Sequence, residues 1–143
     1  MPTRILWIDD DEPTVEMATQ FLKRRGLDVV GCTKSGDGLQ RLRQDEEVAI
    51  VVTDLRMPGF DGFRVLAEAS AVRASGRRFA MFVLTGHATP ADEARAMELG
   101  ADLFRQKPID LPDLLAQVHL HLQILPATPS GTVFRAQGER NDA

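Results

Sequence analysis

Short runs of apolar and β-branched residues alternate along this chain with longer segments in which apolar residues recur every three or four positions. The first pattern predicts β-strands and the second predicts amphipathic helices. Five strands are expected, at residues 4–8, 28–33, 48–53, 79–85 and 102–106. The runs 48–52 and 79–84 are apolar on both faces, which is typical of parallel strands covered by helices on each side. The pattern therefore predicts an α/β fold of five strand and helix units around a central parallel sheet.

Helix signals follow each expected strand. Pro13 suits the first turn of the first helix, in which Val15, Ala18 and Leu22 share a face before Gly26. The other four helices are expected to begin at Ser35, Asp61, Thr89 and Asp110, which are residues that cap helices well. Strands and helices therefore alternate regularly along the chain.

The fourth helix has the weakest apolar face. Its expected inward positions are Ala91, Ala94 and Met97, which bury less area than the leucines of the fifth helix. Regions with few apolar contacts open most easily, so we expect any conformational switch in this helix and the loop before it. A thin helix that simply packs closely on the sheet is the alternative.

The length of 143 residues and a hydrophobic content of 43% suit one domain with a substantial core. The apolar period stops after Leu125, where the sequence becomes rich in proline and small residues. We therefore predict a domain at residues 1–125 and a C-terminal tail or linker at residues 126–143.

The net charge of −4 argues against direct binding of nucleic acid or of an anionic membrane, because both need clustered Lys and Arg. No apolar run approaches the ~18 residues of a membrane span, and the beginning of the chain lacks the pattern of a signal peptide. The single cysteine, Cys32, excludes a disulfide or a cysteine-based metal site within the chain. A cytoplasmic location is expected.

Polar residues follow the ends of four expected strands: Asp9 and Asp10 the first, Asp54 the third, Thr85 the fourth and Lys107 the fifth. Ligands of open parallel sheets gather outside the carboxyl ends of the strands. We therefore expect these acids, the hydroxyl and the amine to converge on one site.

Adjacent carboxylates repel one another unless a cation lies among them. Oxygen ligands without His or Cys at ligand spacing favour a hard cation, and Mg2+ fits best because it typically uses one or two carboxylates with water and phosphate oxygens. The alternative is that the "DDDE" stretch is a solvated helix start stabilised by the helix dipole. This alternative is stronger for Asp11 and Glu12 than for Asp9 and Asp10.

Four segments together resemble the receiver domains of two-component response regulators: "RILWIDDDEP", "VVTDLRMPGFDGF", "VLTGHA" and "GADLFRQKPI". The resemblance spans about residues 4–123, and the order and spacing of the segments make it specific. It implies a flavodoxin-like, doubly wound sheet of five parallel strands in the order 2-1-3-4-5, with five helices and a crevice at the first and third strands.

The resemblance also implies roles for individual residues. Asp54 would be the phosphoacceptor, with Lys107 and Thr85 as its catalytic partners, and Mg2+ would be held by Asp9, Asp10, Asp54 and the backbone carbonyl of Arg56. The phosphoryl donor would be a sensor histidine kinase or a histidine phosphotransfer protein. The protein would catalyse only its own phosphorylation and autodephosphorylation, and would not be an enzyme for outside substrates.

In this family the hydroxyl matching Thr85 and the aromatic ring matching Phe104 act as the switch. They would remodel the face made by the fourth helix, fifth strand and fifth helix, through which a partner or output domain is controlled. A homodimer through the same face is common among relatives and stays open here. Arg56 and His87 flank the expected phosphoryl position, so we hypothesise that they set its lifetime. The alternative is that both are exposed loop residues without effect.

Two other functions remain open. One is an interaction module that has the fold but does not use phosphorylation. The other is a Mg2+-dependent phosphohydrolase with a D-x-D nucleophile motif, whose spacing Asp9 and Asp11 match. The second is less expected, because the Thr that should follow two residues later and a cap domain are both missing.

Overall fold

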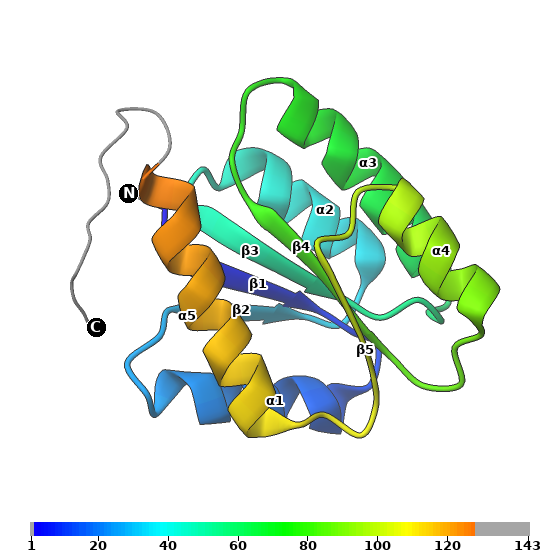
Figure 1. The fold of residues 1–143 in the computed structure, drawn as a ribbon, viewed down its shortest axis with the longest axis horizontal. Helices are drawn as coiled ribbons and strands as arrows, with labels where there is room; N and C mark the ends of the chain where they lie inside the picture. The colour runs from blue at the N-terminus through cyan, green and yellow to red at the C-terminus, as the bar shows by residue number, and fades with distance from the viewer. Residues whose placement is uncertain (1, 128–143) are drawn as a thin grey trace.

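Five parallel strands form the centre of the computed structural model, which describes residues 2–127 (Figure 1). They are β1 (Arg4–Ile8), β2 (Val29–Cys32), β3 (Val48–Thr53), β4 (Ala80–Thr85) and β5 (Leu103–Gln106). Their order in the sheet is β2-β1-β3-β4-β5, and every neighbouring pair is parallel. The expected doubly wound sheet of order 2-1-3-4-5 is therefore confirmed.

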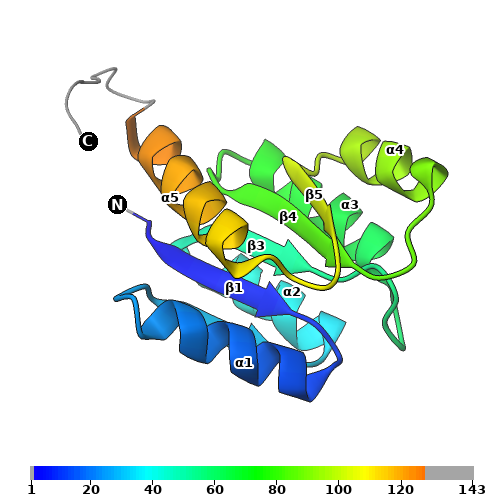
Figure 2. The ribbon, with the colours of Figure 1, turned by 60° about the horizontal axis from the view of Figure 1, so that its bottom comes forward.

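Five helices cover the two faces of this sheet. They are α1 (Glu12–Lys23), α2 (Ser35–Gln44), α3 (Gly62–Ala74), α4 (Pro90–Glu98) and α5 (Leu111–Ala127). Helices α1 and α5 lie on one face and α2, α3 and α4 on the other (Figure 1, Figure 2). Of the tail expected at residues 126–143, the part from residue 128 onward lies outside the described residues.

The alternation of side chains in β1 shows how the two faces are filled. Leu6 and Ile8 pack in the core cluster with α2 and α3, whereas Ile5 and Trp7 pack in the cluster with α1 and α5. All residues of β3 and β4 are buried. These strands therefore bury both of their faces, as their continuous apolar runs predicted.

Helix α4 contacts the core in a different way from the one predicted. Ala91, Ala94 and Met97 are exposed, and Ala96 is the only buried residue of the helix. The expectation that the first three point inward was wrong. Alanines at several positions do not distinguish one helix face from another, so the pattern of small residues did not fix the rotation of α4. The expectation that little apolar area holds this helix agrees with its single buried side chain.

Most of the predicted caps are present. Asp61 accepts a hydrogen bond from the backbone N–H of Arg64, and Asp110 accepts one from Asp113. Ser35 does not cap α2: the N-cap position belongs to Lys34, without a side-chain hydrogen bond. The Ser35 hydroxyl instead donates to the carbonyl oxygen of Phe60 at 2.8 Å. This long-range bond joins α2 to the loop after β3, and no local pattern predicts such a bond.

Candidate functional site

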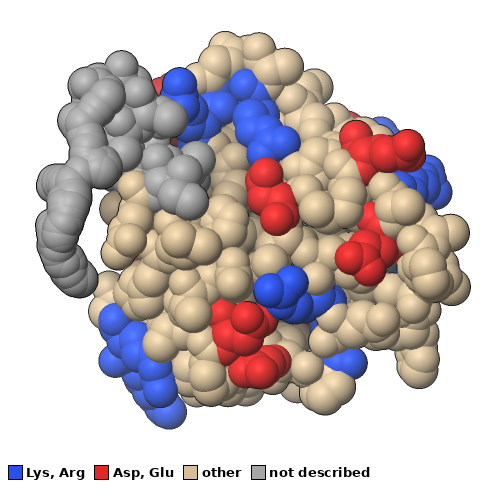
Figure 3. Space-filling model, viewed as in Figure 1, with Lys and Arg blue, Asp and Glu red and all other residues tan. Residues whose placement is uncertain are grey.

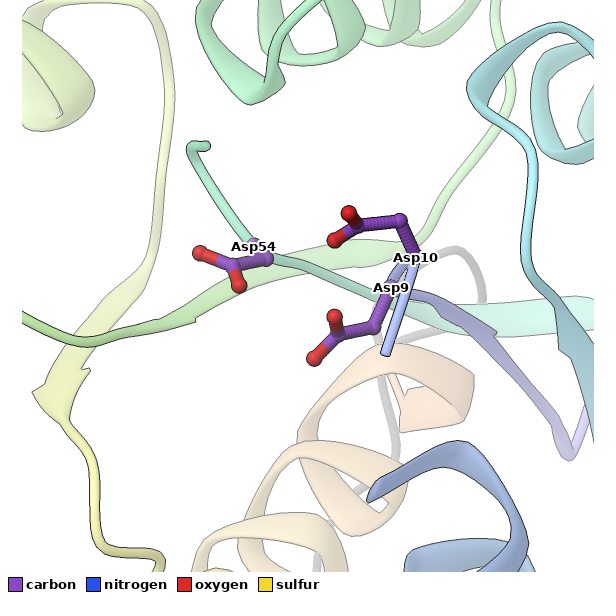
Figure 4. A group of neighbouring side chains, drawn as sticks. All are labelled: Asp9, Asp10 and Asp54. Carbon is purple, nitrogen blue, oxygen red and sulfur yellow. The ribbon is translucent and has the colours of Figure 1, made fainter. Parts of the chain in front are cut away.

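The central strands β1 and β3 deliver two carboxylates side by side. Ile8 pairs with Thr53 in the register of these strands, so Asp9 and Asp54 leave the sheet next to each other. The N–H of Asp54 donates to the carbonyl oxygen of Ile8 at 3.2 Å, which extends the pairing by one residue. Asp10 completes the group, and one carboxylate oxygen from each acid lies within 4.8 Å of the others (Figure 4).

The three acids differ in burial. Asp9 is 1% exposed and Asp54 is 8% exposed, whereas Asp10 is exposed to solvent. Burying a carboxylate is costly unless a cation or hydrogen-bond donors compensate its charge. The two buried acids therefore need partners, which the chain supplies from β5 and from their own loops.

Lys107 follows β5 and lies between the two buried carboxylates. Its Nζ is 2.8 Å from Asp9 Oδ2 and 3.0 Å from Asp54 Oδ2. Burial alone would lower the pKa of Lys107, but the hydrogen bonds and charges of the two acids outweigh burial and raise this pKa. Lys107 is therefore firmly protonated and acts as a shared counterion.

The surroundings of the Asp9 carboxylate disfavour its ionised form. Burial raises its pKa above the usual range, and the nearby Asp54 charge adds to this effect. The hydrogen bonds from Lys107 and from the N–H of Asp11 only partly oppose it. A further cation at this position would stabilise the ionised form.

The backbone around Asp54 is held by the residues that follow it. The N–H of Leu55 donates to Asp54 Oδ1 at 2.6 Å, and the N–H of Gly62 donates to the carbonyl oxygen of Leu55 at 2.9 Å. A Cβ atom on Gly62 would lie only 2.0 Å from the carbonyl oxygen of Asp54. Sequence reasoning missed this contact, although the glycine directly after the helix cap Asp61 is a signal for it.

The acidic group suits a hard divalent cation. Its donors are carboxylate oxygens alone, and the exposed Asp10 leaves room for water ligands, as Mg2+ prefers. Asp11 is used elsewhere, because its side chain accepts the N–H of Thr14 and caps α1. Asp9, Asp10 and Asp54 therefore fit the expected ion, and the carbonyl oxygen of Arg56 as a further ligand stays a prediction.

Thr85 ends β4 and Phe104 lies in β5, and among the described residues no hydrogen bond joins the Thr85 hydroxyl to Asp54. Thr85 is buried at the end of β4, and its hydroxyl donates to the carbonyl oxygen of Gly86 at 3.4 Å. Phe104 is 8% exposed and packs in the core cluster that includes Ala96 of α4. The aromatic ring is therefore already inside the domain in this conformation.

Arg56 and His87 lie in the loops around the acids. The Arg56 guanidinium forms an ion pair with Asp92 of α4, with 2.7 Å between Nη2 and Oδ2. Sequence reasoning missed Asp92 as a partner, since an acid in the first turn of a helix is sufficiently explained by the helix dipole. His87 is exposed and has a φ of 52°, in the left-handed region that costs a residue with a side chain about 1 kcal/mol or more.

A groove of about 540 Å³ opens beside the acids. It is lined by Asp10, by Lys34 and Ser35 at the beginning of α2, and by the loop Pro58 to Phe60. The exposed carboxylate of Asp10 therefore faces a space that a second molecule can enter.

On the face shown in Figure 3, acidic and basic side chains are interspersed. Among residues 2–127, no helix has both the length and the apolar character needed to cross a membrane.

Comparison with known families gives a match to a model described as the response regulator receiver domain, over residues 5–119. Similar solved structures include receiver domain proteins from Methanospirillum hungatei, Pseudomonas putida and Clostridium thermocellum. The protein from Methanospirillum hungatei has 25% identity and a TM-score of 0.80, and the match covers 88% of this chain and 98% of that protein's chain. The protein from Pseudomonas putida has 29% identity and a TM-score of 0.75, and the match covers 84% of this chain and 98% of that protein's chain. The protein from Clostridium thermocellum has 26% identity and a TM-score of 0.78, and the match covers 85% of this chain and 94% of that protein's chain.

Proposed function

The chain belongs to the response regulator receiver domain family, and we propose that it is a phosphorylation-controlled switch whose phosphoacceptor is Asp54. The observation that carries the proposal is the arrangement of Asp9, Asp54 and Lys107, in which one ammonium lies within hydrogen-bonding distance of two buried carboxylates. An acid that only capped a turn would not need this shared cation. The arrangement suits a site in which negative charge is gained and lost.

Asp9, Asp10, Asp54 and the carbonyl oxygen of Arg56 would hold Mg2+ in this proposal. When bound, Mg2+ supplies positive charge that neutralises the oxygens of the transferring phosphoryl group. The chain itself provides the position of the nucleophile, since the N–H of Leu55 fixes Asp54 Oδ1. The groove beside Asp10 gives the phosphodonor an approach to the acids.

In the transfer step, a carboxylate oxygen of Asp54 forms a bond to phosphorus while the bond from phosphorus to the donor's histidine nitrogen breaks. The leaving imidazole keeps the electron pair and takes a proton from solvent. Lys107 would neutralise the negative charge first on the carboxylate and then on the phosphoryl oxygens. Positioning and electrostatics would therefore supply most of the catalysis. Water later hydrolyses the acyl phosphate and restores Asp54. The chain therefore acts on itself and not on outside substrates.

The phosphoryl group adds a charge of about −1.5 to −2, which nearby hydrogen-bond donors must compensate. Lys107 is already in place, and the Thr85 hydroxyl would leave its weak contact with Gly86 to bind a phosphoryl oxygen. Helix α4 can respond, because Ala96 is its only buried side chain. Thr85 and Phe104 would then alter the face of α4, β5 and α5 that controls a partner or output domain, or that forms a homodimer.

The donor would be a sensor histidine kinase or a histidine phosphotransfer protein, and the protein would then act in the cytoplasm. Arg56 and His87 would set the lifetime of the phosphoryl group, by pairing with its oxygens or by obstructing the attacking water. The exposed positions of both side chains allow this role. An unchanged decay of the Asp54 phosphate in an Arg56→Ala variant would contradict it.

Incubation with acetyl phosphate and Mg2+ tests the function. The intact protein should gain the mass of one phosphoryl group, on the peptide that contains Asp54. Asp54→Asn and protein treated with a metal chelator should not gain it. If the untreated wild type gains no mass, the alternative of an interaction module without phosphorylation takes its place.

A phosphohydrolase with a D-x-D nucleophile is the weaker alternative. Asp11 would have to take part in its chemistry, but the Asp11 carboxylate caps α1 through the N–H of Thr14. Steady turnover of p-nitrophenyl phosphate that depends on Asp11 would favour this enzyme over the switch.

A further inference from the structure

One ion pair joins the loop after Asp54 to the beginning of α4. Arg56 Nη2 lies 2.7 Å from Asp92 Oδ2, with the arginine side chain 57% exposed and the aspartate side chain 17% exposed. Arg56 is only two residues after the proposed phosphoacceptor, and Asp92 lies in the first turn of α4. The contact therefore links the two segments that the switch must couple.

The Asp92 carboxylate also helps to cap the N-terminal end of α4. Its Oδ2 accepts the N–H of Thr89 at 3.0 Å, while the N–H of Asp92 donates to the Thr89 hydroxyl at 3.1 Å. This reciprocal pair is a capping box. The hydrogen bond from Thr89 and the charge of Arg56 both lower the pKa of Asp92. A movement of Arg56 would therefore disturb the first turn of α4.

Charged contacts matter for α4 because apolar ones are few. Ala96 is its only buried residue, and the neighbouring Arg95 places its guanidinium 4.1 Å from the centre of the Phe63 ring on α3. The ion pair between Arg56 and Asp92 thus adds a charged contact to a helix that has a single buried residue.

We infer that Arg56 exchanges partners when Asp54 is phosphorylated, leaving Asp92 for the phosphoryl oxygens. The Asp92 carboxylate offers one negative charge, whereas a phosphoryl group offers about −1.5 to −2 and three oxygens suited to an arginine fork. The ion pair is then a latch: it restrains the first turn of α4 and keeps Arg56 from the phosphoryl position. This inference rests on the proposed function. It adds that the first turn of α4 is released when Arg56 leaves Asp92.

The latch can be tested first without any phosphoryl group. Asp92→Asn removes the charge that faces Arg56 but keeps an oxygen that can accept the Thr89 N–H. Glu93→Gln is the matched control, because it removes a charge from the same helix turn and Glu93 forms no side-chain hydrogen bond within residues 2–127. Hydrogen exchange of the amides at residues 93–98 should be about two- to fivefold faster in Asp92→Asn, and unchanged in Glu93→Gln. Equal exchange in the two variants would overturn the latch.

The exchange of partners is tested with beryllofluoride and Mg2+, by a fluorine NMR titration of the full chain. Asp92→Asn should bind beryllofluoride about two- to fivefold more tightly than the wild type. In an Arg56→Gln background, Asp92→Asn should change the affinity no more than Glu93→Gln does. The same tightening with and without Arg56 would overturn the exchange. A wild type that binds no beryllofluoride would contradict the proposed function itself, whereas equal amide exchange would contradict the latch alone.

Discussion

The ammonium of Lys107 donates a hydrogen bond to Asp54 Oδ2 at 3.0 Å. The same ammonium reaches Asp9 at 2.8 Å, so it occupies the space between the two buried carboxylates. A divalent cation bound by these acids would share that space with Lys107. In the proposed function, the lysine would therefore compete with the metal before phosphorylation and bind the phosphoryl group afterwards.

This competition predicts opposite effects of Lys107→Met on two properties. Mg2+ should bind at least about fivefold more tightly, because removing a unit charge at about 4 Å is worth at least about 1 kcal/mol even with the dielectric constant of water. Phosphoryl uptake from acetyl phosphate should be severely reduced. Isothermal titration calorimetry measures the first effect and intact mass the second.

Lys34→Met is the control for Lys107→Met. Lys34 is an exposed lysine that lines the groove beside Asp10 and has no ion pair with the described residues. Its removal should change Mg2+ affinity much less, because solvent screens exposed charges. Weaker binding of Mg2+ by Lys107→Met would contradict the competition.

Gly62→Ala should damage the site through the backbone. The new Cβ would lie 2.0 Å from the carbonyl oxygen of Asp54 and 2.7 Å from the Cα of Leu55, so main-chain atoms must move. We expect a loss of about 1–3 kcal/mol in the free energy of unfolding, measured with urea, and less labelling of Asp54. Gly36→Ala is the control, since its nearest neighbour is the Phe60 ring at 3.9 Å. It should be neutral or stabilising by up to about 1 kcal/mol.

Asp45 should make stability depend on pH in the acid range. Burial alone would raise its pKa, but hydrogen bonds from Arg41, Arg4 and the N–H of Glu47 outweigh burial and lower the pKa to about 2. A carboxyl whose pKa is lower in the folded state stabilises that state above its unfolded pKa of about 4. This contribution disappears as the pH falls from about 4 through about 2.

The matching measurement is urea denaturation of Asp45→Asn and the wild type at several pH values. Near neutral pH the variant should be less stable by about 1 kcal/mol, after allowance for solvent screening of the ion pairs. The difference should shrink toward zero near pH 2. Asp28→Asn is the control, because Asp28 also pairs with Arg4 but its side chain is 49% exposed. A difference that stays constant down to about pH 2 would exclude this role for Asp45.

The sheet and the place of the acids could be predicted because both depend on patterns along the chain. Strands β1 and β3 have the expected limits, β2, β4 and β5 each begin one residue later than expected, and β2 also ends one residue earlier. Once the strand order is known, the carboxyl ends must bring Asp9, Asp54 and Lys107 to one edge. Topology alone therefore positions these three side chains.

The contacts of Arg56 with Asp92 and of Ser35 with Phe60 could not be predicted. They join residues that are distant in the sequence, and a helix-end role already explains Asp92 and Ser35. Asp92 suits a first helix turn with or without Arg56, and Ser35 suits a cap although it bonds to Phe60. The rotation of α4 is the same kind of problem, since alanine is a good helix former on any face. Only the packing of the whole domain decides which alanine is buried.

The rotation of α4 predicts a difference between two alanines that are two residues apart. Ala96 is fully buried and Ala94 is exposed, and both lie inside the helix. Substitution by glycine costs each about 1 kcal/mol in helix propensity, but only Ala96→Gly also removes a buried methyl group, worth about 0.8 kcal/mol. Urea denaturation should show a loss of about 2 kcal/mol for Ala96→Gly and about 1 kcal/mol for Ala94→Gly. The reverse order would mean that Ala94 faces the sheet, as the sequence pattern alone suggested.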